Sequence, residues 1–238
     1  MNDYDLLRKY VDESKWKKSF KLLNQGYPVQ YIIGNVEFIN NIIFVNKNVL
    51  IPRFETEYLV EKTLKYIKKY NINNPKILDL CTGSGCIAIS IASELNITVD
   101  ALDISKKALR IAKKNALHNK VNVNFFKSDL EKFVPNKKYD VIISNPPYVS
   151  FNEDVDPKTY YEPSLALYAI DNGLYYYKAI FNRYKKYLSD KYFLAFEIGE
   201  TEGISLLDYA KVSFPKANIW IEKDLNNKDR YLFITNFE

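Results

Sequence analysis

From Lys76 onward, short apolar runs alternate with segments whose apolar positions recur at helical spacing. This alternation is typical of a parallel sheet with helices on both faces. The apolar runs predict seven strands, at Lys76–Leu80, Val99–Ile104, Val123–Lys127, Val141–Ser144, Phe193–Ile198, Asn218–Glu222 and Tyr231–Thr235. The segments between them predict helices at about Gly85–Leu95, Ser105–Asn115, Gly173–Leu188 and Glu202–Val212.

The last connection sets the direction of the final strand. Only Lys223–Arg230 joins the last two strands, whereas a parallel crossover needs about a dozen residues or more. We therefore predict a seven-stranded, Rossmann-like α/β sheet with six parallel strands and one antiparallel strand.

The beginning of the chain follows a different pattern. Loosely helical spacing from Asp5 to Leu23 predicts one or two short helices. Val36–Val45 predicts a connecting β-hairpin that turns at Asn40-Asn41, because asparagine tolerates the positive φ of a tight turn. A helix is expected over Glu55–Tyr70, with Thr56 as a possible cap.

Composition narrows the class of protein but does not name it. The 238 residues are 47% hydrophobic and carry a net charge of +5, which suits a packed globular protein with either ordinary solubility or an acidic partner. Cys81 and Cys86 are too few for a disulfide framework, and no cluster completes a metal site. No apolar run has the length of a signal peptide or membrane span. We expect a cytoplasmic, monomeric protein with no metal and no membrane partner.

The first predicted strand of the sheet leads into the turn Cys81-Thr82-Gly83-Ser84-Gly85. Small residues at such a turn let a ligand approach the backbone closely. The second strand ends near Asp103, 18 residues past Gly85, where a carboxylate can accept both ribose hydroxyls of an adenosine cofactor. These residues alone do not separate this cofactor from a nicotinamide dinucleotide, or from a tight turn that binds nothing.

Asp129 and Leu130 follow the third strand at the same edge of the sheet. Asp129 could accept a hydrogen bond from an adenine amino group while Leu130 covers the ring. Alternatively, Asp129 only caps the turn that begins at Leu130.

The fourth strand ends in Asn145-Pro146-Pro147-Tyr148, the most informative stretch of the chain. The two prolines remove two backbone donors and fix φ, so the segment is rigid and its carbonyls are free to bond a guest. The Asn145 side-chain oxygen and the Pro146 carbonyl can each accept one hydrogen of a planar NH2 group. Tyr148 supplies an aromatic wall for that group. We therefore predict that Asn145, Pro146 and Tyr148 are catalytic and that Asn145–Tyr148 bind the substrate.

An amide nitrogen is a poor nucleophile because its lone pair is delocalised into the carbonyl. Alignment of the nitrogen with a methyl donor can supply up to about 7–11 kcal/mol of the barrier. No general base is required if the proton of the product nitrogen passes to solvent or a carbonyl.

With these motifs the sequence resembles the release-factor glutamine N5-methyltransferases, the PrmC/HemK family. The likeness runs from about Gln30 to the C-terminus. Its most specific matches are Gln30-Tyr31-Ile32-Ile33-Gly34 and Ile51-Pro52-Arg53-Phe54-Glu55-Thr56-Glu57. Further matches are Asp79–Gly85, Asp103–Ser105, Asn145–Tyr148, Glu162-Pro163, Gly173-Leu174 and Glu197-Ile198-Gly199.

The resemblance implies a class I methyltransferase sheet that uses S-adenosylmethionine. It places this cofactor at Cys81–Gly85, Asp103, Leu130 and Asn145, and the substrate glutamine at Asn145–Tyr148. The implied substrate is the glutamine of a Gly-Gly-Gln sequence in a peptide chain release factor. Accordingly we expect residues 1–50 to form a reduced N-terminal helical segment with the hairpin, and residues 51–238 to form the methyltransferase domain.

The sequence also departs from the family pattern. Cys81 stands where the family usually has glycine, and we expect an ordinary extended backbone there because a positive φ would cost about 1–2 kcal/mol. Phe54 replaces a proline, and Ala169-Ile170 replaces a pair of glycines. The segment before Gln30 is much shorter than the family's N-terminal domain.

Two other functions fit part of the pattern. A nucleic-acid methyltransferase uses the same rigid segment Asn145–Tyr148, called the ledge from here on, because a flipped adenine or guanine also presents a planar NH2 group. Its basic, aromatic-interleaved recognition segment is missing, since pairs such as Lys113-Lys114 and Lys185-Lys186 are scattered, and we expect no stable nucleic-acid partner. A non-catalytic binding module is the third hypothesis, and the intact Asn145–Tyr148 argues against it.

Overall fold

A computed structural model describes residues 2–238 and contains the predicted seven-stranded sheet. The strands lie in the order β10-β11-β9-β6-β3-β4-β5. Only β11 runs antiparallel to its neighbours, which confirms six parallel strands and one reversed strand. The strand bounds are Ile77–Leu80 (β3), Val99–Asp103 (β4), Val123–Lys127 (β5), Tyr139–Ser144 (β6), Leu188–Glu197 (β9), Asn218–Lys223 (β10) and Asp229–Thr235 (β11).

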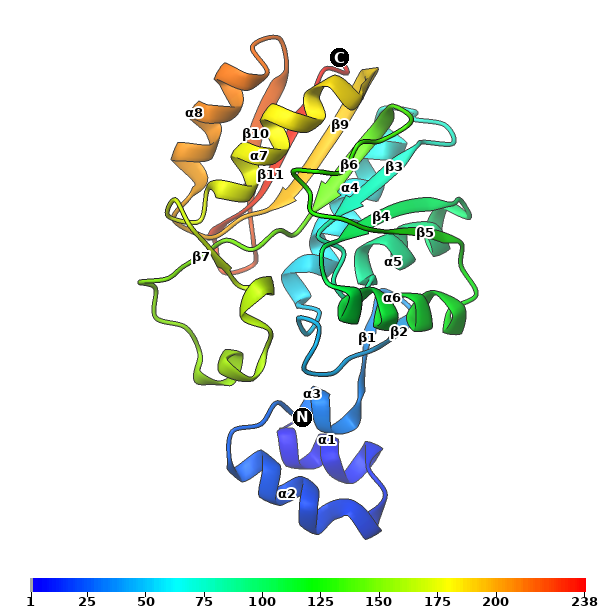
Figure 1. Cartoon of the computed structure of the whole chain (residues 1–238), viewed down its shortest axis with the longest axis vertical. Coiled ribbons are helices and arrows are strands. Elements are labelled where there is room, and N and C mark those ends of the chain that lie inside the picture. The colour runs from blue at the N-terminus through cyan, green and yellow to red at the C-terminus, as the bar shows by residue number, and fades with distance from the viewer. Residues whose placement is uncertain (1) are drawn as a thin grey trace.

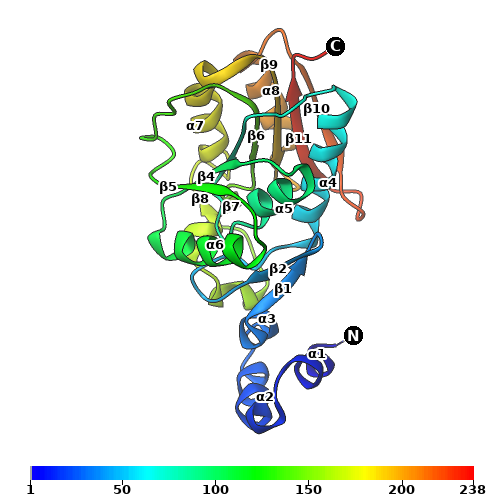
Figure 2. The ribbon, with the colours of Figure 1, turned by 90° about the vertical axis from the view of Figure 1, so that its right-hand side faces the viewer.

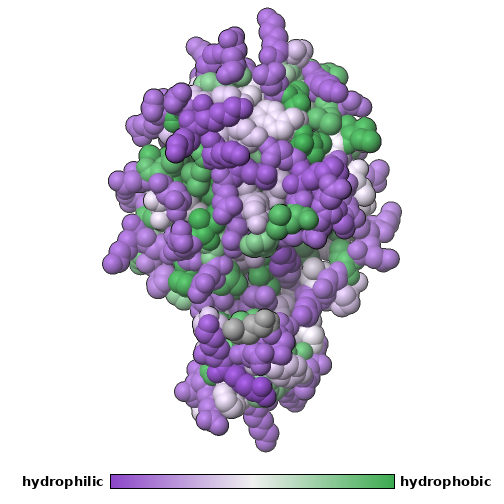
Figure 3. Space-filling model, turned by 180° about the vertical axis from the view of Figure 1, so that it is seen from behind, coloured by the Kyte–Doolittle hydropathy of each residue, from purple (hydrophilic) through white to green (hydrophobic). Residues whose placement is uncertain are grey.

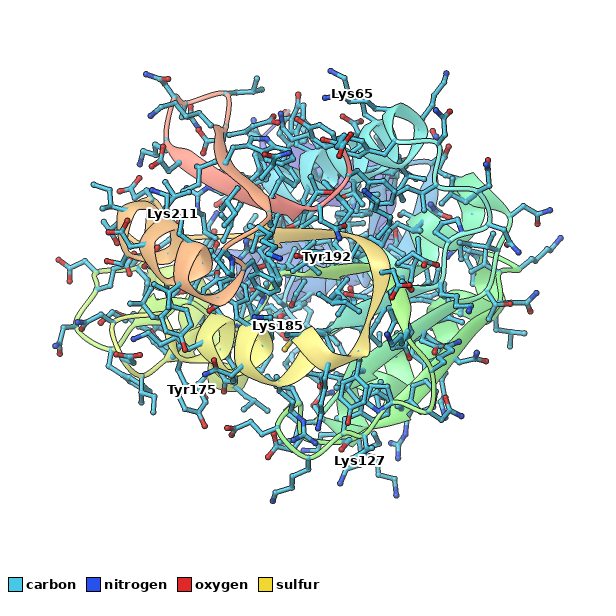
Figure 4. All side chains as sticks on the ribbon, turned by 90° about the horizontal axis from the view of Figure 1, so that it is seen from above. Lys65, Lys127, Tyr175, Lys185, Tyr192 and Lys211 are labelled. Carbon is cyan, nitrogen blue, oxygen red and sulfur yellow. The ribbon has the colours of Figure 1, made fainter. Side chains whose placement is uncertain are left out.

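Helices cover both faces of this sheet (Figures 1 and 4). Because successive side chains of a strand point to opposite faces, Ile77 of β3 belongs to one hydrophobic core and Leu78 to the other. The first core is covered by α4 (Phe54–Lys69), α5 (Cys86–Leu95) and α6 (Lys106–His118). The second is covered by α7 (Tyr175–Tyr184), with the 3-10 turn η4 (Lys185–Tyr187), and by α8 (Gly203–Ser213).

Three short helices at the start of the chain lie apart from the sheet (Figures 1 and 2). They are α1 (Asp3–Tyr10), α2 (Trp16–Asn24) and α3 (Val29–Ile33), with the 3-10 turn η1 (Glu13–Lys15) between the first two. Leu7, Leu23 and Val29 form a small core of their own. None of the helices within residues 2–238 is long and apolar enough to cross a membrane.

The connecting hairpin consists of β1 (Asn35–Phe38) and β2 (Asn41–Phe44). Phe38 pairs with Asn41, so the turn residues are Ile39 and Asn40, with φ of 41° and 58°. The prediction of a turn at Asn40-Asn41 was therefore wrong by one residue. Positive φ at both central residues matches the twist of the two strands, and the pairing places a β-branched isoleucine there.

Two asparagines on α6 hold the hairpin. The Asn115 side chain accepts from the Phe44 N–H at 2.9 Å and donates to the Phe44 carbonyl at 3.1 Å. One turn later, Asn119 makes the same two contacts with Ile42, at 3.1 and 2.9 Å. Asn115 also donates to the Ser84 carbonyl at 2.8 Å, which ties the hairpin to the glycine-containing turn.

The predicted loop at Phe151–Pro163 contains the 3-10 helix η2 (Pro157–Tyr161). It lies within a longer excursion between β7 (Val149–Ser150) and β8 (Tyr168–Ala169), which also includes η3 (Ser164–Ala166). The Tyr161 hydroxyl donates to the Gln25 carbonyl at 2.7 Å, and its ring packs edge-on against Tyr27. The loop thus contacts the N-terminal helices.

Seen from behind, most of the surface is hydrophilic, with hydrophobic residues scattered between (Figure 3).

Candidate functional site

A cavity of about 250 Å³ opens where the carboxyl ends of β3, β4 and β6 meet the turn after β5. The sequence-predicted residues Cys81, Gly83, Asp103, Asp129, Leu130 and Pro147 line it. Other predicted residues do not, namely Thr82, Ser84, Gly85, Asn145, Pro146 and Tyr148. The remaining walls come from segments that the sequence did not assign to a ligand, including Asn48–Leu50, Ser105, Pro163, Leu165, Tyr175 and Tyr176.

The turn after β3 approaches the cavity with its backbone in left-handed conformations. Gly85 has a φ of 85°, and a Cβ placed there would lie 3.1 Å from Ala112 Cβ. Cys81 also has a positive φ, of 61°, so the expected extended backbone was wrong. This conformation brings the Thr82 N–H to the Leu102 carbonyl at 2.9 Å and the Thr82 hydroxyl to Asp79 Oδ2 at 2.5 Å. These two hydrogen bonds offset the cost of a side chain at a positive φ.

Asp79 lies beneath this turn and is fully buried. Burial raises its pKa to about 7, because the charged form loses its hydration. Its Oδ1 atom has no hydrogen-bond partner among the described residues. Thr82 and Ser84 are buried too, so they shape the turn and do not line the cavity.

Asp103 at the end of β4 holds the turn in place. Its Oδ2 accepts from the Gly83 N–H at 2.8 Å and its Oδ1 accepts from the Ser105 N–H at 2.7 Å. Burial raises the pKa of this carboxyl as well. Each carboxylate oxygen retains a further lone pair, so Asp103 can still accept hydroxyl groups from a ligand in the cavity.

At Asp129 both readings of the sequence find support. Its Oδ1 accepts from the Glu131 N–H at 2.9 Å, which is a capping contact. The residue also lines the cavity beside Leu130, whose side chain is 6% exposed. A cap that uses one carboxylate oxygen leaves the other available to a ligand.

Asn145, which follows β6, is fixed through α4. Its Nδ2 donates to Thr56 Oγ1 at 3.1 Å, and that hydroxyl donates to Glu197 Oε2 at 2.6 Å. Thr56 therefore does not cap α4, whose N-cap is Arg53 without a side-chain hydrogen bond. The Tyr148 hydroxyl donates to Glu197 Oε1 at 3.1 Å, and burial raises the pKa of Tyr148 well above its ordinary value.

Two acceptors of the ledge have no protein partner. No N–H or O–H group among residues 2–238 donates to Asn145 Oδ1 or to the Pro146 carbonyl. Asn145 Oδ1 is not buried, so it is open to solvent. Asn145 Oδ1 is therefore available to an N–H donor of a guest, and the Pro146 carbonyl has no competing donor among these residues.

Thr56 and Glu197 belong to sequence motifs that match the family, but neither was predicted to take part in this site. The signal that could have found them is a buried hydroxyl one turn into a helix and a carboxylate at the end of an apolar strand. Neither position satisfies its polar group by local contacts, so each needs a partner from elsewhere in the fold.

The fold and the place of this cavity are those of a class I methyltransferase. The sequence-family model described as "Methyltransferase small domain" matches residues 56–159. Among solved structures, a methyltransferase from Pyrococcus furiosus covers 94% of this chain and 100% of its own with a TM-score of 0.62 and 17% identity. The structure named protein-(glutamine-N5) methyltransferase (release factor-specific), from Alicyclobacillus acidocaldarius, covers 82% and 99%, with a TM-score of 0.51 and 24% identity. At these identities both likenesses show the fold.

Curated proteins with a higher sequence identity than these two structures identify the family. The protein named release factor glutamine methyltransferase of Bacillus subtilis is 39% identical over 91% of this chain and 78% of its own. The protein of that name from Flavobacterium psychrophilum is 40% identical over 96% of this chain and 82% of its own. This chain belongs to the release factor glutamine methyltransferase family, which decides against a nicotinamide-binding enzyme.

Proposed function

We propose that this enzyme transfers a methyl group from S-adenosylmethionine to the N5 nitrogen of a glutamine side chain in a peptide chain release factor. The observation that carries the proposal is that neither Asn145 Oδ1 nor the carbonyl of the next residue, Pro146, has a donor among residues 2–238, while Asn145 Nδ2 is bonded to Thr56. A primary amide has two N–H donors in one plane, which matches two acceptors on one rigid ledge.

The residues of the cavity fit S-adenosylmethionine. Asp103 offers carboxylate oxygens for ribose hydroxyls, and Leu130 offers an apolar surface for a base. The backbone of Cys81–Gly83 allows close approach, and Asp129 has one carboxylate oxygen that makes no capping contact. When bound, the cofactor supplies an electrophilic methyl group on a positively charged sulfur.

The chain's own residues orient the nucleophile. Asn145 Oδ1 and the Pro146 carbonyl accept the two amide hydrogens, so the plane of the glutamine side chain is fixed. As the nitrogen forms its bond to the methyl carbon, positive charge grows on it, and these two oxygens stabilise that charge. The sulfur of the bound cofactor would keep the electron pair of the broken C–S bond. The product nitrogen loses one proton to solvent, and no ionised base on the protein is needed.

Tyr148 forms a wall beside this ledge, and Pro147 joins the ledge to the cavity. The Glu197 carboxylate holds the Tyr148 hydroxyl at 3.1 Å, so the ring has a defined orientation. A flat amide packed against it is shielded from water, which strengthens its hydrogen bonds to the two acceptors.

The expected boundary between an N-terminal segment, residues 1–50, and a methyltransferase domain, residues 51–238, suggests a role for each part. We propose that the helical segment and hairpin of residues 1–50 help to hold the release factor while residues 51–238 carry out methyl transfer. A substrate of this kind implies action in the cytoplasm, where translation terminates.

Labelled methyl transfer to the release factors of the same organism tests the function. We expect label on one glutamine, located by mass spectrometry of the digested release factor, and no label when that glutamine is replaced by alanine. Label found only in ribosomal RNA would identify the enzyme as a nucleic-acid methyltransferase and overturn the proposal.

Asn145→Ala tests the ledge in the same assay. We expect loss of methyl transfer with cofactor affinity within about tenfold of the parent, since about one hydrogen bond is removed. Unchanged turnover would remove Asn145 from the reaction.

A further inference from the structure

Behind the substrate ledge lies a short chain of hydrogen bonds that the reaction itself does not use. It runs from Asn145 Nδ2 to Thr56 Oγ1 at 3.1 Å and from Thr56 to Glu197 Oε2 at 2.6 Å. Tyr148 bonds the other oxygen of the same carboxylate at 3.1 Å. Thr56 is 2% exposed and Glu197 1% exposed, so water does not compete for these contacts.

Counting the hydrogens that these side chains can donate fixes the direction of each hydrogen bond. An ionised carboxylate only accepts, so both Thr56 and Tyr148 must donate to Glu197. The threonine hydroxyl has a single hydrogen, and once this is donated the hydroxyl can only accept from Asn145. The group of Asn145 that faces Thr56 is therefore the NH2 group, and the oxygen must point the other way.

This count settles which of two nearly isosteric orientations the Asn145 amide adopts. Oxygen and nitrogen of an amide occupy similar positions, and their assignment follows from their partners. With the amide reversed, the ledge would present N–H donors to the N–H donors of the substrate and would not bind it. The direction of a hydrogen bond behind the ledge thus decides whether the ledge works.

We infer that Thr56 and Glu197 are positioning residues, which lock the Asn145 amide with its oxygen toward the substrate nitrogen and hold the Tyr148 ring beside it. This inference rests on the proposed function. Neither residue lines the cavity, so their effect on turnover passes through their hydrogen bonds to Asn145 and Tyr148.

This fixed orientation of the Asn145 amide, called the lock from here on, depends on the charge of Glu197. Burial raises the pKa of this carboxyl above its ordinary value, and Thr56, Arg230 and Tyr148 partly oppose that effect. The ionisable or hydroxyl groups that face it come from five elements or segments: Glu55 and Thr56 of α4, Tyr148 after β6, Tyr177 of α7, Cys86 of α5, and Arg230 with Tyr231 of β11.

Protonation would reverse the order of donors. A neutral Glu197 can donate to Thr56, whose hydroxyl is then free to donate to Asn145 Oδ1 and to hold the amide in the wrong orientation. The lock is therefore complete at pH values above the raised pKa of Glu197 and is lost as pH falls through it.

Two variants of Thr56 test the inference. Thr56→Val removes the hydroxyl with little change of shape, and we expect kcat to fall by about tenfold or more, with the cofactor Kd within about twofold of the parent. Thr56→Ser keeps the hydroxyl and serves as the matched control, with kcat within about threefold of the parent. If Thr56→Val turns over at the parental rate, or if serine fails to restore turnover, the inference is wrong.

Glu197→Gln provides an independent measurement, which also decides the matter if Thr56→Val does not fold. An amide cannot titrate, so the acid limb that we expect in the parent's pH profile of log kcat should be absent in this variant. Persistence of the same acid limb in Glu197→Gln would overturn the inference. The proposed function and this inference fail in different ways. A parent enzyme that does not methylate a release factor refutes the glutamine substrate. An active parent whose Thr56 and Glu197 variants keep the parental turnover refutes only the positioning role of these two residues.

Discussion

The Glu162 carboxylate accepts a hydrogen bond from the Ile51 backbone N–H at 2.9 Å, across 111 positions of sequence. Its other oxygen bonds the Arg53 guanidinium, and the Glu162 side chain is only 2% exposed. The two segments joined in this way both supply walls of the cavity, through Asn48–Leu50 in the first and Pro163, Leu165 and Ala166 in the second. One buried carboxylate thus closes the cavity wall.

Replacement of Glu162 should open that wall. In Glu162→Ala the Ile51 N–H and the Arg53 guanidinium lose their partner, so the loop no longer has a fixed position. We expect the affinity for S-adenosylmethionine, measured by titration calorimetry, to fall about tenfold, which is about 1.4 kcal/mol. Glu153→Ala, an exposed carboxylate of the same loop, is the control and should bind like the parent. Equal affinities of all three proteins would show that the contact does not shape the cavity.

Cys81→Gly should stabilise the protein. The φ of 61° is strained for a side chain but not for glycine, although glycine also gives the unfolded chain more freedom. The net gain in the free energy of unfolding should be about 0.5–1 kcal/mol, measured by urea denaturation. Cys81→Ala keeps the Cβ and should show no gain. A glycine variant that is less stable than the alanine variant would contradict this account.

Asp79 should make stability depend on pH. In the unfolded chain its carboxyl has the ordinary value of 3.8, and in the folded protein burial raises its pKa to about 7. Between these values the folded state binds more protons than the unfolded state, so stability falls as pH rises and is constant above about 7. The total change is of the order of 4 kcal/mol.

Thermal unfolding at a series of pH values checks this in two proteins. In Asp79→Asn the group cannot ionise, so the decline in Tm from pH 5 to pH 7 should be clearly shallower than in the parent, by about 1 kcal/mol or more in free energy. Parallel Tm curves for the two proteins would mean that Asp79 does not change its charge over this range.

Asn115→Ala should destabilise the protein more than Asn119→Ala does. Asn115 is fully buried and serves the Phe44 backbone and the Ser84 carbonyl, whereas Asn119 is half-buried. Loss of buried partners costs about 1–3 kcal/mol for each unsatisfied group, so we expect about 2–4 kcal/mol for Asn115→Ala by urea denaturation. The reverse ranking of the two variants would contradict the structure.

The sheet could be predicted from the sequence because its pattern is local and repeated. Each central strand is a short apolar run such as Val141–Ser144, and burial on both faces makes such runs continuous. The length of Lys223–Arg230 was enough to set the direction of β11. These features depend on neighbours in the chain, which the sequence displays directly.

What escaped prediction depends on distant partners. Thr56 had the residue type and place of a helix cap, yet its hydroxyl bonds Glu197, 141 positions away. Cys81 was expected to avoid a positive φ because its own side chain disfavours one, but contacts of Thr82 with Leu102 and Asp79 outweigh that preference. The turn at Ile39 was missed for the same reason, since pairing of β1 with β2 places it there.

The lysines of this chain are spread along the sequence and do not gather in one segment. Lys65, Lys127 and Lys211 lie on different sides of the molecule (Figure 4), in keeping with lysines that solvate the surface.

The contacts of Asn115 and Asn119 with β2 have a consequence for how molecules of this enzyme meet one another. Side-chain amides one helical turn apart occupy the N–H and C=O groups of Phe44 and Ile42, as the backbone of an adjoining strand would. A solitary hairpin normally offers such groups to any passing extended chain and so invites aggregation. Here the helix imitates the missing neighbour, and the enzyme keeps a two-stranded ribbon next to its active site without exposing that border to self-association.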